Sequence, residues 1–189
     1  MPLRGIWVDR SLTLPQPARF AGFMLVAQIN EGAMKPELYA HLRSQLRSLV
    51  ADERDFIANA ANLSSLLYHS VPDLNWAGFY VHKNNELVLG PFHGQPACVR
   101  IAIGKGVCGT AAQQRQTIIV DNVHDFPGHI ACNSLSNSEI VVPLIKDGRL
   151  IGVLDLDSPK VGRFDEEDAR GLNELVEVFV ESSSLEFGH

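Results

Sequence analysis

The stretch that decides the fold runs from Cys98 to Asp157 and reads CVRIAIGKGVCGTAAQQRQTIIVDNVHDFPGHIACNSLSNSEIVVPLIKDGRLIGVLDLD. It contains all three cysteines of the chain, Cys98, Cys108 and Cys132. A lone cysteine often serves as a small apolar core residue. Three cysteines in one stretch, two of them in glycine-containing segments, instead favour redox chemistry.

The end of this stretch predicts a hairpin of two strands. Residues Ser138–Lys146 and Leu150–Asp157 are joined by Asp147-Gly148, a strong hairpin-turn signal. By the two-residue period, Asp155 and Asp157 follow apolar residues on one face of the second strand. Two acids at the end of an apolar face either lie in water at the rim of the sheet or face a ligand cavity.

The start of the stretch predicts a strand at Val99–Ile103, a helix at Val107–Gln114 and a strand at Thr117–Val120. The Gly104-Lys105-Gly106 segment before the helix lacks the Walker spacing, so it is interpreted as a turn rather than a phosphate loop. The loop at Asp121–Asn137 is long for a compact domain, and such loops are often functional.

Upstream, Asn75–His82 and Glu86–Phe92 predict a further hairpin. Trp76 and Tyr80 share one face of its first strand. Two large aromatic residues on one face either belong to the core or form the floor of an apolar ligand pocket, and the sequence leaves both readings open.

Helices are predicted at both ends of this sheet. The first begins near Pro36 and the second at about Asp52, an expected N-cap, while the last runs from about Asp165 to near Ser184. The pattern predicts an α+β fold, a single domain with a mainly antiparallel sheet flanked by N- and C-terminal helices. Residues 1–33 are interpreted as a poorly ordered extension or as the result of a start codon assigned too early, and residues 34–189 as the single domain, which carries all the candidate functional residues.

Composition excludes several classes of protein. The 189 residues suit one domain. A net charge of −6 argues against nucleic acid as a partner, and no apolar run is long enough to span a membrane. The odd cysteine count, without a convincing signal peptide, indicates reduced thiols in the cytoplasm.

The cysteines themselves permit two kinds of chemistry. Zinc binding through the three thiols and a histidine is disfavoured, because no C-x-x-C pair is present and the spacing is poor. The alternative is a nucleophilic thiolate with a second cysteine that traps the oxidised sulfur as a disulfide. We therefore expect no metal and no cofactor.

Six blocks carry a specific resemblance: NWAGFY, LVLGPFHGQPACVRI, GKGVCGTA, FPGHIAC, SNSEIVVPL and GVLDLDSP. Together they closely resemble the free methionine-(R)-sulfoxide reductases, a family with the GAF fold. The resemblance covers the chain from about Met34 to the end of the last helix, and the extra N-terminus is its one large deviation.

The resemblance implies reduction of free methionine-(R)-sulfoxide, with thioredoxin as the electron donor. It places the nucleophile at Cys132 and the main resolving cysteine at Cys98, and it leaves the role of the third cysteine, Cys108, less settled. It assigns substrate binding and catalysis to Glu139, Asp155 and Asp157, with Trp76 and Tyr80 as pocket aromatics. It also implies a homodimer.

Two other functions stay open at this point. A non-catalytic GAF module would bind a small ligand without turnover, and a redox-sensing protein would form a disulfide with peroxide without preferring a sulfoxide. The single-domain length argues against a sensor module, since such modules usually accompany an output domain.

Overall fold

The computed structural model describes residues 34–128, 130 and 134–184. Eleven elements follow one another along them: α1 (Lys35–Leu49), α2 (Phe56–Ser70), β1 (Trp76–Lys83), β2 (Glu86–Gly94), β3 (Arg100–Ala102), α3 (Gly106–Gln114), β4 (Ile118–Val120), the 3-10 turn η2 (Val123–Asp125), β5 (Ser138–Lys146), β6 (Arg149–Ser158) and α4 (Glu166–Ser182). No helix in these ranges has the length and apolar character needed to cross a membrane. The expected extension at residues 1–33 lies outside the described part of the chain.

The six strands form one sheet in the order β3-β2-β1-β6-β5-β4, and each pair of neighbours is antiparallel. Two tight hairpins fix the local register. Asn84 and Asn85 have φ of 50° and 63°, and Asp147 and Gly148 have φ of 50° and 73°. Positive φ at both central residues is what a type I′ hairpin turn requires, so both predicted hairpins are confirmed.

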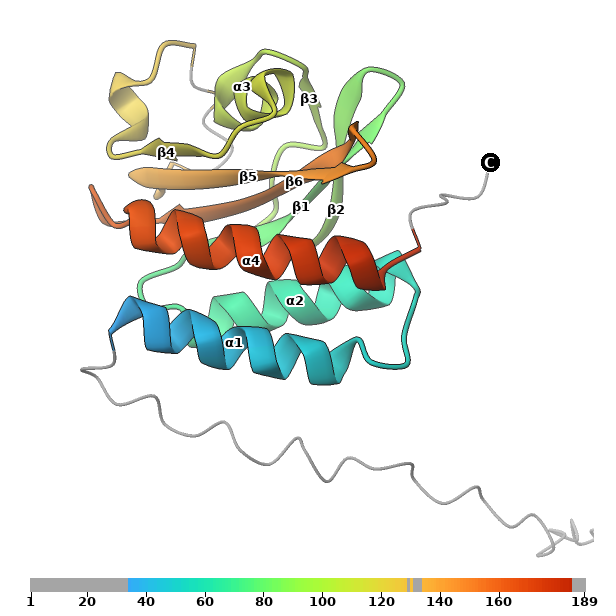
Figure 1. Cartoon of the computed structure of the whole chain (residues 1–189). Helices are drawn as coiled ribbons and strands as arrows, with labels where there is room; N and C mark the ends of the chain where they lie inside the picture. The colour runs from blue at the N-terminus through green and yellow to red at the C-terminus, as the bar shows by residue number, and fades with distance from the viewer. Residues whose placement is uncertain (1–33, 129, 131–133, 185–189) are drawn as a thin grey trace, which may run out of the picture.

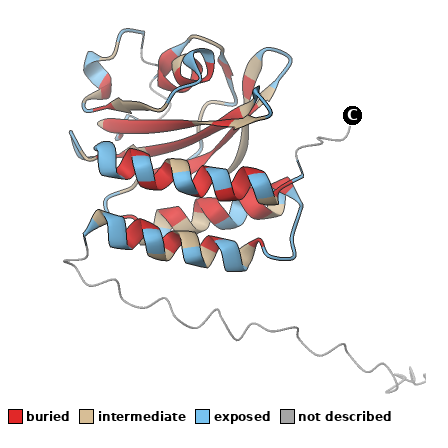
Figure 2. Cartoon of the chain, viewed as in Figure 1, coloured by how far each residue is buried: buried red, intermediate tan, exposed pale blue. Residues whose placement is uncertain are grey.

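The sheet separates two layers (Figure 1). Helices α1, α2 and α4 lie on one side, with α1 outermost, and α3 lies on the other side. The central strands β1, β5 and β6 are largely buried on both faces, whereas each of the three helices on the first side buries only one side of its surface (Figure 2). The predicted α+β fold with an antiparallel sheet and terminal helices is therefore confirmed.

Alternation along each strand divides the apolar residues between two cores. Phe79 and Leu154 belong to the core under the three helices. Trp76, Tyr80 and Val153 belong to the core beside α3. This second core surrounds the site considered below.

The predicted start of α2 at Asp52 was wrong by three residues. Asp55 is the N-cap, and its side chain accepts a hydrogen bond from Ala58 N. The preceding turn is stabilised separately, because Glu53 Oε1 accepts hydrogen bonds from the backbone N–H groups of Arg54 and Asp55. At α4 the predicted cap is confirmed, since Asp165 accepts from the N–H groups of Glu167 and Asp168.

Candidate active site

Three adjacent strands place acidic and aromatic side chains on one face of the sheet. Asp157 of β6 lies opposite both Trp76 of β1 and Glu139 of β5. Asp155, two residues before Asp157, lies opposite Gly78. Because side chains alternate along a strand, all of these positions share the face that α3 covers. The register thus gathers residues from distant parts of the chain.

An aromatic wall forms one side of the site. The Trp76 ring stacks against Phe92 with centroids 5.4 Å apart and planes 12° apart, and against Tyr80 at 5.9 Å. Trp76 Nε1 donates a hydrogen bond to the carbonyl oxygen of Gln95. A Cβ at Gly78 would lie 2.6 Å from the Trp76 ring and 2.3 Å from Phe92 Cβ. Glycine is therefore required there for the ring to lie flat.

Helix α3 covers the opposite side and presents Cys108. The helix approaches β3 so closely that a Cβ at Gly109 would lie 2.4 Å from the carbonyl oxygen of Ala102. Cys108 is a buried free thiol, and its Sγ–H donates to Glu139 Oε1 across 3.7 Å. Cys108 is thus both a core residue and a wall of the site.

Between the aromatic wall and α3 lies a cavity of ≈ 490 Å³ including its open mouth. Its described lining consists of Trp76, Tyr80, Ala97, Ile101, Lys105, Gly106, Val107, Cys108, Ile130, Ser136, Glu139, Asp155 and Asp157. Six of the eight predicted site residues therefore line one cavity. These six residues come from β1, α3, β5 and β6, so the cavity lies where these elements meet.

Burial dominates the electrostatics of the carboxyl groups. It raises the pKa of Glu139 well above its ordinary value, and the charges of Asp155 and Asp157 raise it further. The pKa of Asp155 is raised by burial and then by the charge of Asp157. Burial also raises the pKa of Asp157 to about 7, against a hydrogen bond from Ser136. Neutral and ionised carboxyl groups thus coexist in the cavity near neutral pH.

The Cys108 thiol is held in its neutral form. Burial raises its pKa, and the charges of Asp155 and Glu139 add to the effect. Since the thiolate is the reactive nucleophile, a thiol in this environment is poorly suited to attack a substrate. It is suited to donate a hydrogen bond.

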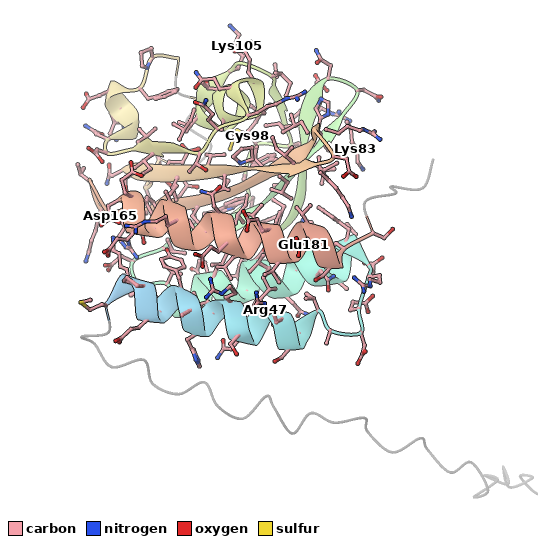
Figure 3. The ribbon with its side chains drawn as sticks, viewed as in Figure 1. Arg47, Lys83, Cys98, Lys105, Asp165 and Glu181 are labelled. Atoms are coloured by element: carbon pink, nitrogen blue, oxygen red, sulfur yellow. The ribbon has the colours of Figure 1, made fainter. Side chains whose placement is uncertain are left out.

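The structure describes only one of the two remaining cysteines, Cys98. Cys98 lies half-buried in the segment between β2 and β3, and Figure 3 places its side chain between α3 and the sheet. Cys98 is disulfide-bonded. Cys132, the predicted nucleophile, lies outside the described residues. Of the two histidines in the long loop, His129 also lies outside them, and His124 bonds Asn137 across the loop through Nε2.

Several lining residues were not predicted from the sequence. Lys105 is the one basic residue among the described residues of the lining, and Figure 3 shows its side chain at the α3 end of the molecule. The glycine-flanked lysine before a helix is the available signal, but without the Walker spacing it predicts only a turn. Ser136 and Ile130 come from the long loop, where no periodic pattern indicates which side chains turn inward.

A family model and several known proteins match this chain. The GAF domain family matches residues 59–179. The free methionine-R-sulfoxide reductase of Escherichia coli (strain K12) is 53% identical over 142 residues, which cover 75% of this chain and 86% of that protein.

Two solved structures share the fold and much of the sequence. The free methionine-R-sulfoxide reductase of Neisseria meningitidis in complex with its substrate is 47% identical, with a TM-score of 0.77, over 79% of this chain and 90% of that one. A GAF sensor protein of Burkholderia vietnamiensis is 64% identical, with a TM-score of 0.78, over 80% of this chain and 96% of that one.

Proposed function

Because the chain belongs to the free methionine-(R)-sulfoxide reductase family, we propose that it reduces free L-methionine (R)-S-oxide to L-methionine with a cysteine thiolate. The observation that carries the proposal is the group of three acids, Glu139, Asp155 and Asp157, in one cavity with the Trp76 ring. Such a cavity matches a small zwitterion with an apolar S-methyl end.

Ionised carboxylates supply the counter-charge for the substrate ammonium. An amide nitrogen in a peptide carries no charge and gains nothing from these acids, so the free amino acid is selected. Lys105 offers a positive charge to the substrate carboxylate. The flat Trp76 ring provides an apolar surface for the S-methyl group.

A neutral carboxyl group activates the sulfoxide. The sulfur becomes electrophilic when its oxygen receives a proton or a strong hydrogen bond, and an acid whose pKa is raised by burial retains that proton near neutral pH. Asp157, with a pKa of about 7, holds its proton in part of the molecules at this pH. The raised pKa values of Glu139 and Asp155 favour the same protonated form.

The redox step transfers the oxygen to a cysteine. The Cys132 thiolate attacks the substrate sulfur, the oxygen takes up a proton, and methionine leaves while Cys132 becomes a sulfenic acid. The Cys98 thiol then attacks that sulfur, which releases water and forms a Cys98–Cys132 disulfide. Thioredoxin restores both thiols by thiol–disulfide exchange. The enzyme works in the cytoplasm as a homodimer.

Two properties of the described cysteines support these roles. The buried, protonated Cys108 thiol is a poor nucleophile. Cys98, in contrast, takes part in a disulfide.

Turnover with defined substrates tests the proposal. The reduced full-length protein is supplied with thioredoxin, thioredoxin reductase and NADPH, and methionine formation is followed with the free R epimer, the free S epimer and the N-acetylated R epimer. We expect turnover of the free R epimer alone. Comparable turnover of the N-acetylated compound would contradict ammonium recognition.

A non-catalytic ligand-binding or redox-sensing module is the second candidate, favoured by the similarity to a GAF sensor protein. The same assay separates the two. A binding module retains the sulfoxide without forming methionine. A redox sensor forms a disulfide with peroxide as readily as with sulfoxide.

A further inference from the structure

Three potential metal ligands from three different elements converge in the cavity. They are Cys108 of α3, Glu139 of β5 and Asp155 of β6. One ligand atom from each lies within 4.8 Å of the others, and the three residues are only 4%, 6% and 6% exposed. A sulfur and two carboxylate oxygens thus face one point in a buried site.

Asp155 supplies an independent sign that this point accepts a ligand. The Asp155 carboxyl group is hydrogen-bonded to Cys108 and Glu139, but its Oδ1 atom is buried and has no hydrogen-bond partner within the described part of the chain. A buried oxygen of this kind is costly unless a positive charge or a donor reaches it. A ligand that brings positive charge next to Asp155 removes that cost.

The donor set selects the type of cation. Thiolate and carboxylate ligands together suit Zn²⁺, which binds sulfur at about 2.3 Å and oxygen at about 2.0–2.2 Å in a tetrahedron. Two ligands of one tetrahedral zinc therefore lie roughly 3.5 Å apart, and Cys108 Sγ lies 3.7 Å from Glu139 Oε1. Mg²⁺ and Ca²⁺ prefer six or more oxygen ligands, and a buried thiol is a poor partner for either.

We propose that Cys108, Glu139 and Asp155 bind one thiophilic divalent cation such as Zn²⁺, and that the bound ion blocks the cavity. Binding displaces the Cys108 proton and the protons held by the carboxyl groups, which pass to the buffer. A water molecule or Asp157 completes the coordination. The ion takes the place of the substrate ammonium, so it acts as a competitor rather than a cofactor. The blocking of substrate rests on the proposed function, whereas ion binding does not.

Cobalt absorption tests the ligand set without any measurement of activity. The chain has three cysteines, so the full-length Cys98→Ser/Cys132→Ser variant keeps Cys108 as its one thiol. Titration of this variant with Co²⁺ should give a thiolate-to-cobalt charge-transfer band that saturates at one ion per chain and is lost when Zn²⁺ is added. Absence of the band would overturn the proposal.

Matched variants of the same protein identify the ligands. Adding Cys108→Ala should abolish the band, and adding Asp155→Asn should weaken Co²⁺ affinity at least tenfold. Adding Asp125→Asn, an exposed acid of η2, should leave affinity unchanged. A band that survives Cys108→Ala would place the ion elsewhere. If circular dichroism shows that Cys108→Ala does not fold, the Asp155→Asn variant tests the ligand set, and unchanged Co²⁺ affinity in that variant would overturn the proposal.

Competition connects the ion to the cavity. In the Cys98→Ser/Cys132→Ser variant, which has no proposed nucleophile, free methionine-(R)-sulfoxide should raise the apparent dissociation constant of Zn²⁺ in proportion to its concentration. Calorimetry with sulfoxide alone is the control. If sulfoxide binds but does not displace Zn²⁺, the blocking role is wrong. If Zn²⁺ binds and sulfoxide does not, the metal site stands and the proposed function fails.

Discussion

Glu139 and Asp157 lie directly opposite each other on β5 and β6, and both carboxyl groups line one cavity. Asp157 ionises at about 7 in the folded protein, against an ordinary value of 3.8. Between these pH values the folded chain holds a proton that the unfolded chain has lost. Stability is therefore greatest at the acidic end of this window and falls as the pH rises through it. The raised pKa values of Glu139 and Asp155 act in the same direction.

We expect the Asp157→Asn substitution to reduce this dependence. The unfolding free energy of the wild type should fall by ~3 kcal/mol more than that of the variant between about pH 5 and about pH 8. Urea unfolding at both pH values measures the difference. The same variant should lose sulfoxide reduction at pH 8 while staying at least as stable as the wild type. Equal pH dependence in the two proteins would show that Asp157 ionises normally.

Phe92 supports Trp76 although it is not part of the cavity lining. Phe92 is 37% exposed, and its ring stacks on the Trp76 indole with centroids 5.4 Å apart. Since a stacked pair contributes about 0.5–1.5 kcal/mol, Phe92→Ala should lower kcat/KM for the free sulfoxide roughly two- to tenfold. Phe92→Tyr should restore it. Ile57→Ala, at an exposed apolar residue of α2, is the control for general surface effects. Unchanged kinetics in Phe92→Ala would mean that Trp76 keeps its position without the stack.

Asp168 connects three segments on the helical side of the sheet. Its fully buried carboxylate accepts from Lys35 Nζ at 2.6 Å, Tyr39 OH at 2.8 Å and Arg163 Nη1 at 3.2 Å. Loss of one partner from a buried charge network costs about 3–5 kcal/mol. Asp168→Asn should therefore lower the melting temperature by roughly 6–20 °C, with little change in activity per folded molecule below the transition.

Glu174→Gln is the matched control for Asp168→Asn. Glu174 pairs with Arg43 between the same two helices, but its side chain is half-exposed. Exposed pairs contribute about 0–1 kcal/mol, so this variant should melt within a few degrees of the wild type. Equal melting temperatures of the Asp168→Asn and Glu174→Gln variants would show that the Asp168 network contributes no more stability than a surface ion pair.

Residues 1–33 are predicted to be dispensable. The first described helix begins at Lys35, and its residues Leu38 and Leu42 belong to the same core cluster as Leu172 and Phe179 of α4. A chain that starts at Met34 should therefore keep the sulfoxide reductase activity and the melting temperature of the full chain. Parallel assays of the two proteins measure both quantities. A large loss of either would show that the extension packs on the domain.

Much of the architecture could be predicted because its signals are local. The Asn84-Asn85 and Asp147-Gly148 turns each determine a hairpin within a few residues. The two-residue period correctly placed Asp155 and Asp157 on one face. The start of α2 was misplaced because several acids precede it, and sequence alone does not show which of them caps the helix.

The cavity could not be predicted in the same way. Trp76 lies opposite Asp157 only because β1 pairs with β6, and pairing between strands far apart in sequence depends on the whole core. Lys105 and Ser136 reach the cavity from irregular segments that lack any periodicity. The hydrogen bond between Cys108 and Glu139 likewise depends on how α3 packs against the sheet.

Methionine release in a single turnover tests the central claim most directly. The thiols of the wild type and the Cys132→Ser and Cys98→Ser variants are fully reduced, the reductant is removed, and free methionine-(R)-sulfoxide is added. We expect about one methionine per chain from the wild type, about one from Cys98→Ser, which then stalls as a sulfenic acid, and none from Cys132→Ser. Methionine release by Cys132→Ser would contradict the account and assign the nucleophile to another cysteine.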